Sequence, residues 1–93
     1  MRVHEFSIKQ QLSRDQLVHI SSEASRFSSN ITITFNIGDA EHRIDVKSLL
    51  GMMLMIVAPG SSIRLTAAGE DDLEALEYLV PMLEGSGQYL TTD

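Results

Sequence analysis

The sequence contains no cysteine, so no disulfide or thiol chemistry contributes to its stability or its activity. That absence fits a reducing compartment. Basic residues are also few, because seven Lys and Arg stand against 13 Asp and Glu and give a formal charge of −6 at pH 7. A nucleic-acid partner needs clustered cations, and those of this chain are scattered. The composition therefore argues against nucleic acid as a partner.

Long apolar runs are missing as well. The longest run covers residues 49–58, and its ten residues fall short of the about 20 that a membrane-spanning helix needs. Residues 1–9 alternate polar and apolar side chains and lack the apolar segment of a secretory signal. We therefore expect a cytoplasmic protein with no membrane partner.

The chain has the length and composition of one globular domain. It has 93 residues, of which 43% are hydrophobic and 22% are charged, which suits a single core. We expect the domain to cover residues 1–84 and residues 85–93, which open with Gly-Ser-Gly, to form a mobile tail. The three histidines, His4, His19 and His42, fall on different predicted elements without ligand spacing, so we expect no metal site and no cofactor.

Hydrophobic periodicity predicts the order strand, helix, strand, strand, helix, strand, helix. The strands are expected at residues 3–8, 30–37, 42–46 and 63–67. The clearest one alternates polar residues with an apolar face made of Ile31, Ile33, Phe35 and Ile37. This order predicts an α+β fold in which three helices cover one face of a four-stranded antiparallel sheet. A ferredoxin-like interaction domain shares the first six elements and stays open as an alternative.

Two of the helices carry an apolar stripe at helical spacing. The first is expected to begin with a capping box of Ser13 and Gln16, to end near Ser28, and to bury Leu17, Ile20, Ala24 and Phe27. Its solvated side is expected to hold Ser21, Ser22, Glu23 and Ser25. The last helix begins at the acidic run 70–72, and its expected stripe is Leu73, Leu76, Val80 and Leu83. Pro81 is expected to kink or fray it.

The middle helix is the most informative segment. Ser48 has the chemistry of an N-cap, and the apolar run that follows it predicts a helix over residues 48–57 with no polar side. Such a helix must show apolar surface, which calls for a partner. We expect Leu49, Leu50 and Met53 to include exposed side chains and Leu54 and Val57 to turn inward. The methionines of the run are either core filler or partner contacts.

Three segments of the chain resemble HPr, the small phosphocarrier of the bacterial sugar phosphotransferase system. They are residues 23–34, 46–53 and 63–71, and the most specific is Val-Lys-Ser-Leu-Leu-Gly-Met-Met at 46–53. The resemblance implies the βαββαβα open-faced β-sandwich of that family. In Gram-positive members the Ser of the Lys-Ser pair is the target of an ATP-dependent kinase. The resemblance thus implies regulatory phosphorylation of Ser48 and partner contacts by Leu49, Leu50 and Met53.

The carrier chemistry of that family has no counterpart in this chain. HPr accepts a phosphoryl group on the His of a Gly-Leu-His-x-Arg-Pro signature at the start of its first helix. The corresponding stretch here is Gln11-Leu12-Ser13-Arg14-Asp15-Gln16, which puts Ser13 at the His position and Asp15 at the Arg position. No His lies between His4 and His19. A carboxylate in place of the Arg would repel the incoming anion.

The resemblance implies a binding protein and not an enzyme. We expect a regulatory paralogue in the phosphotransferase system or in carbon catabolite control, similar to catabolite repression HPr. Its expected partners are proteins, such as a transcriptional regulator, an HPr kinase or a second copy of the chain. The alternatives are an active phosphocarrier with a non-standard acceptor and the ferredoxin-like interaction domain.

Overall fold

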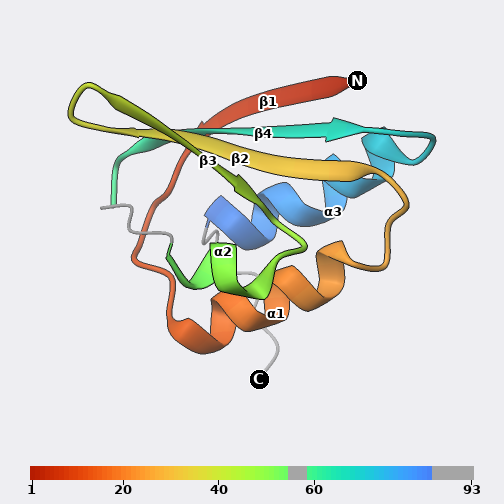
Figure 1. Ribbon diagram of the computed structural model, residues 1–93, viewed down its shortest axis with the longest axis horizontal. Helices are drawn as coiled ribbons and strands as arrows, with labels where there is room; N and C mark the ends of the chain where they lie inside the picture. Colours follow the sequence, from red (N-terminus) through yellow and green to blue (C-terminus); the bar gives the residue numbers. More distant parts are fainter. Residues whose placement is uncertain (55–58, 85–93) are drawn as a thin grey trace.

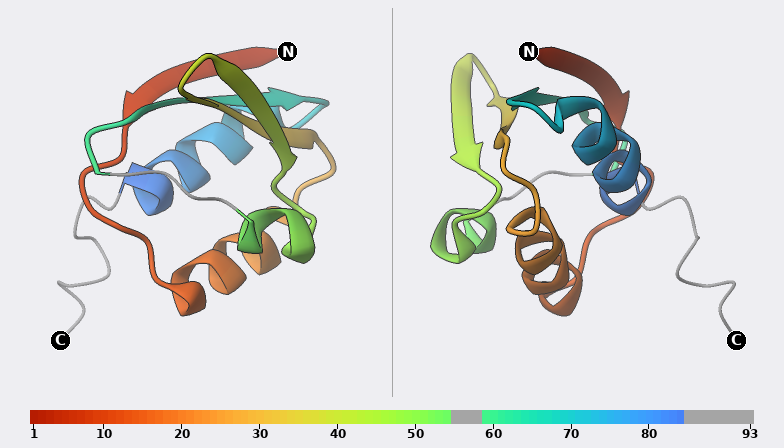
Figure 2. Two further views of the ribbon diagram at one scale, coloured as in Figure 1. Left: turned by 60° about the vertical axis from the view of Figure 1, so that its left-hand side comes forward. Right: turned by 90° about the vertical axis from the view of Figure 1, so that its right-hand side faces the viewer.

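Strands and helices follow one another in the order that the sequence predicts. The computed structural model describes residues 1–54 and 59–84. Its elements are β1 (Arg2–Ser7), α1 (Arg14–Ala24), β2 (Asn30–Ile37), β3 (Ala40–Asp45), α2 (Leu49–Met53), β4 (Ser62–Ala68) and α3 (Asp72–Glu84). The three helices lie on one side of the sheet and leave its other face open (Figure 1, Figure 2). The predicted α+β architecture is therefore confirmed. No helix of the described ranges is long and apolar enough to cross a bilayer.

The sheet has the strand order β1-β4-β2-β3, and every neighbouring pair is antiparallel. Ile33 of β2 stands opposite Leu65 of β4 and Ile44 of β3, so the centre of the sheet is lined with aliphatic side chains. Because side chains alternate between the faces of a strand, the residues that flank Ile33 by two positions, Ile31 and Phe35, join it in the core. The helices thus pack on the apolar face of β2.

The end of this strand differs from the prediction. Ile37 is exposed, because it pairs with Ala40 at the last position before the Gly38-Asp39 turn, at the tip of the hairpin. β3 also begins two residues earlier than expected, since Gly38 adopts a φ of 61° and allows the two-residue turn. Val46 is buried just beyond the strand, where its N–H donates to the Ile31 carbonyl at 2.9 Å.

Helix α1 begins as the sequence predicts. The Gln16 N–H donates to Ser13 Oγ at 3.1 Å, and the Ser13 N–H donates to Gln16 Oε1 at 2.7 Å, which confirms the capping box. The helix ends at Ala24, earlier than expected, and Phe27 is only partly buried. The assignment of Ser21 to the solvated side is wrong. Ser21 is buried because it lies one turn from both Leu17 and Ala24, on the face that packs inward.

The buried face of α3 differs from the predicted one. Leu76 and Leu83 are buried as predicted, whereas Leu73 is exposed and Val80 is only partly buried. The positions that the prediction missed are Ala75, Leu79 and Met82. The helix does not fray at Pro81 but continues to Glu84, because Met82 and Leu83, which follow the proline, are held in the core.

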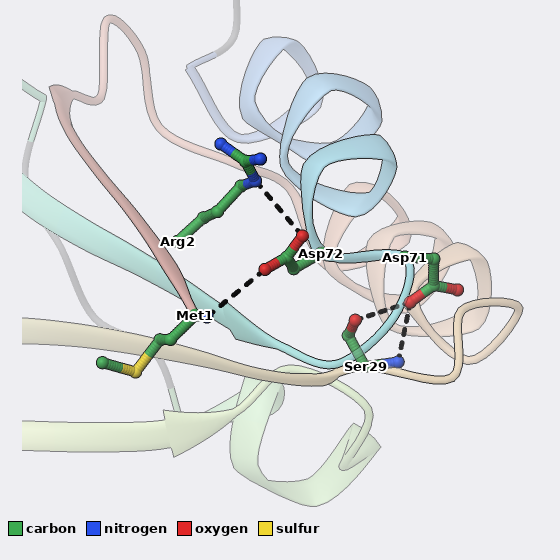
Figure 3. Close-up of polar contacts among 5 residues, drawn as sticks. All are labelled: Met1, Arg2, Ser29, Asp71 and Asp72. Carbon is green, nitrogen blue, oxygen red and sulfur yellow. Dashed lines mark hydrogen bonds and ion pairs between the residues drawn. The ribbon is translucent and has the colours of Figure 1, made fainter.

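The acidic run before α3 does more than start a helix. Asp71 Oδ2 accepts from the Ser28 N–H at 2.8 Å. Asp71 Oδ1 accepts from the N–H and the hydroxyl of Ser29 at 2.9 and 2.5 Å (Figure 3). These bonds, above all the one from the Ser29 hydroxyl, lower the pKa of Asp71 to about 2. Asp72 pairs with Arg2 at 3.2 Å (Figure 3). The Asp71 bonds thus join the loop before β2 to the loop before α3, and the Asp72–Arg2 pair joins α3 to β1.

Candidate functional site

Ser48 begins α2 as the sequence predicts. Its backbone is extended, its Oγ accepts from the Gly51 N–H at 3.2 Å, and its carbonyl accepts from the Met52 N–H at 3.0 Å. The side chain of Ser48 is half-buried. Gly51 brings the helix close to β3, because a Cβ there would lie 3.0 Å from Ile44 Cγ2. Ser48 and Gly51 together set the position of α2 at the edge of the helical layer.

The helix is shorter than predicted. It ends at Met53, and the N–H of its C-cap, Leu54, donates to the Gly51 carbonyl at 3.0 Å in a tightened last turn. The expected helix over 48–57 is wrong at its C-terminal end, since the helix ends at Met53 with Leu54 as its C-cap. The expectation for Val57 falls on residues 55–58, which lie outside the described residues, as does the expected tail at 85–93.

One side of α2 and its C-cap carries four apolar residues, which we call the α2 patch: Leu49, Leu50, Met53 and Leu54. Leu49 is 47% exposed, Leu50 is 80% exposed, and Met53 is partly exposed. Leu54 was expected inside, and this is wrong because it is 73% exposed. The buried anchor is Met52, and two residues turn a helix by about 200°, so Leu54 lies on the opposite side of the axis from Met52.

Lys47 holds the start of α2 in place. Its N–H donates to Asp45 Oδ1 at 3.0 Å, and its Nζ donates to the Phe27 carbonyl at 2.7 Å. The Lys47 side chain thus links the start of α2 to the segment that follows α1. This contact gives the Lys that precedes the capping Ser a structural role.

The start of α1 is occupied by its own cap. Ser13 and Asp15 are both exposed, and Ser13 Oγ serves as the acceptor for the Gln16 N–H. Within the described part of the chain, no carboxylate or imidazole forms a hydrogen bond with the Ser13 hydroxyl. Asp15 is the acidic residue of the first turn, where a carboxylate interacts favourably with the helix dipole. This end of α1 therefore already carries a negative charge.

A second polar cluster fastens α1 to α3. Glu23 Oε1 accepts from the Tyr78 hydroxyl at 2.6 Å and from Arg26 at 2.8 Å. The hydrogen bond from Tyr78, followed by that from Arg26, lowers the pKa of Glu23, and the same contact with Glu23 raises the pKa of Tyr78. His19 is exposed on the same helix. The residues that the structure describes contain no cluster of His, Cys, Asp and Glu that could hold a metal ion.

The fold and the exposed second helix define a class, that of small α+β domains with an open sheet face. A family model described as the PTS HPr component phosphorylation site matches residues 17–85. The HPr-like protein Crh of Halalkalibacterium halodurans is 36% identical over 62 residues, which are 67% of this chain and 69% of that protein. The chain therefore belongs to the HPr family of the phosphotransferase system and catabolite control.

Solved structures agree with this assignment. The histidine-containing phosphocarrier protein of a mycoplasma matches with a TM-score of 0.78 at 26% identity, over 91% of this chain and 94% of that one. The catabolite repression protein Crh of Bacillus subtilis, an intertwined dimer with a swapped domain, matches with a TM-score of 0.68 at 30% identity, over 90% and 92%. The HPr-like open-faced β-sandwich is confirmed, and the ferredoxin-like alternative is wrong.

Proposed function

We propose that this protein is a regulatory member of the HPr family that acts by binding other proteins through the α2 patch. The exposure of Leu50 and Leu54 carries this proposal, because large aliphatic side chains grouped on a short helix are costly to hydrate. The patch lies on the segment that carries the most specific part of the family resemblance. We place the protein in the cytoplasm, where the phosphotransferase system supplies its partners.

The start of α1 supports a binding role over a carrier role. The position at which the family accepts phosphate falls on Ser13, whose Oγ is engaged as a helix cap. The Arg position falls on Asp15, and a carboxylate about 4 Å from a phosphoryl group repels it by about 1 kcal/mol even in water. The family model matches from residue 17 onward, so the match leaves both residues out. An active carrier that uses a non-standard acceptor is the second candidate.

Phosphorylation of Ser48 is the proposed switch. The side chain is partly accessible, and its Oγ accepts a bond from the Gly51 N–H, so the hydroxyl lies at the N-terminus of the helix, where the helix dipole favours an added negative charge. A phosphate there would add about two negative charges beside Leu49 and so change which partners fit the α2 patch. The partners that we propose are a transcriptional regulator and an HPr kinase. A second copy of the chain is the alternative, which the dimeric state of Bacillus subtilis Crh supports.

Labelling by a purified HPr kinase with radioactive ATP tests this function. We expect the wild-type chain to be labelled, Ser48→Ala to lose the label, and Leu50→Glu to be labelled at least tenfold more slowly. Leu73→Glu is the matched control, because Leu73 is also an exposed leucine but lies on α3. Labelling of Ser48→Ala, equal rates for Leu50→Glu and Leu73→Glu, or an unlabelled wild-type chain would contradict the proposal.

A further inference from the structure

The sheet face that points away from the helices contains a polar hollow. Thr32 and Thr34 alternate along β2 with the core residues Ile31 and Ile33, so their side chains stand on the open face. A hollow of about 320 Å³ lies over this part of the sheet. It is lined by Met1, Val3, Thr32, Thr34, Arg43, Arg64 and Thr66. Neither the α2 patch nor the start of α1 shares a residue with it.

The strand register places an arginine on each side of one threonine. Thr34 pairs with Arg43 of β3 on one side and with Arg64 of β4 on the other. Thr34 itself is only 8% exposed. Thr32 pairs with Thr66 in the neighbouring row. Three threonines and two arginines therefore line the same hollow.

Two acids border this hollow, because Glu5 and Glu41 line an adjoining hollow that shares Thr34 and Arg64 with it. The lining of the first hollow itself, as far as the structure describes the chain, includes no Asp or Glu. Glu5 pairs with Arg64 at 3.0 Å, but its side chain is 61% exposed, and such surface pairs contribute little. Asp45 is turned toward the Lys47 N–H. Among the described residues Arg43 forms no ion pair, so two cations flank Thr34 in a protein whose net charge is −6.

We propose that this hollow binds the phosphate group of a small phosphorylated ligand. Its volume suits a small molecule, and Arg side chains bind phosphate through parallel N–H donors. A phosphate monoester offers three terminal oxygens, which can meet Arg43 and Arg64 from opposite flanks and still accept from a threonine hydroxyl between them. A carboxylate has two oxygens in one plane and would satisfy only one of the two flanks. The bound anion would also relieve the repulsion between the two cations.

Titration with inorganic phosphate, followed through the backbone amide resonances, tests this site. Ionic strength is held constant with chloride, and acetate is titrated in parallel. We expect saturable shifts at residues 32–34, 43 and 64–66 with phosphate and at least tenfold weaker binding of acetate. Arg43→Gln should weaken phosphate binding about tenfold, equal to about 1.4 kcal/mol. Glu5→Gln should tighten it, because it releases Arg64 from its partner.

Lys9→Gln is the matched control, because it removes the same charge from an exposed residue outside the hollow. We expect this variant to bind phosphate as the wild-type chain does. Shifts that grow without saturation would overturn the proposal. Equal binding by Arg43→Gln and Lys9→Gln, or binding of acetate as tight as that of phosphate, would overturn it as well.

Discussion

Asp71 Oδ1 accepts hydrogen bonds from both the backbone N–H and the hydroxyl of Ser29, which lies 42 residues earlier in the chain. This pair closes the domain where the loop before β2 meets the loop before α3 (Figure 3). Gly69 permits the approach, since a Cβ at that position would lie 2.7 Å from the Ser29 Cα. Part of the stability of the domain therefore depends on the ionised form of the Asp71 carboxyl group.

The first prediction concerns acid stability. The pKa of Asp71 is lowered from 3.8 to about 2, so its contribution is fully present above about pH 4 and is lost as the pH falls toward 2. We expect Asp71→Asn to lower the melting temperature at pH 7 and to flatten the loss of stability over that acidic window. Thermal unfolding as a function of pH measures both effects.

The control for this prediction is Asp39→Asn. Asp39 lies in the turn between β2 and β3 and forms no hydrogen bond or ion pair within the described residues. Its replacement should leave the pH dependence unchanged. An unaltered acid transition in Asp71→Asn would show that the carboxylate does not stabilise the fold in this way. Some pH dependence should remain in that variant, because the pKa of Glu23 is also lowered by Tyr78 and Arg26.

The second prediction separates the two sides of α2. Met52 is fully buried, so Met52→Ala should lower the free energy of unfolding by about 2–5 kcal/mol. Leu54 is mostly exposed, so Leu54→Glu should change it by about 0.5 kcal/mol or less. Denaturant unfolding of both variants provides the comparison. A large loss of stability in Leu54→Glu would place that side chain in the core and reduce the α2 patch.

The third prediction concerns the capping box of α1. Ser13→Ala removes the acceptor for the Gln16 N–H and should destabilise the protein by about 1 kcal/mol. Ser22→Ala is the matched control, because Ser22 is an exposed serine inside the same helix and alanine is the better helix former there. Chemical denaturation distinguishes the two. If both variants were equally stable, the hydroxyl of Ser13 would be free of its capping role.

The sequence predicts those features that depend on neighbouring residues. The strict alternation in β2 gives its bounds correctly, and the capping residues Ser13 and Ser48 both stand where the helices begin. Side-chain direction at the ends of elements was harder to predict. Ile37 continues the alternation but lies at the hairpin tip, and Leu54 continues the apolar run but follows the last turn of α2. The periodicity of a strand or helix does not show where the packing layer that covers its apolar face ends.

The contacts between distant segments could not be predicted from local pattern. Asp71 resembles an ordinary first-turn acid in the sequence, and only the fold brings it to Ser28 and Ser29. The same holds for Arg43 and Arg64, which share a face because β2 lies between β3 and β4. The candidate site at Ser48 depended on a local motif and was therefore visible in the sequence.

Phosphoryl transfer from phosphoenolpyruvate through enzyme I tests the central claim most directly. An authentic HPr serves as the positive control in the same reaction, and the radiolabel is followed at neutral pH. A regulatory member of the family that has Ser13 and Asp15 at the start of α1 should take up no stable label. Stable labelling of this chain at Ser13 or His19 would contradict the account and would make the protein a phosphocarrier.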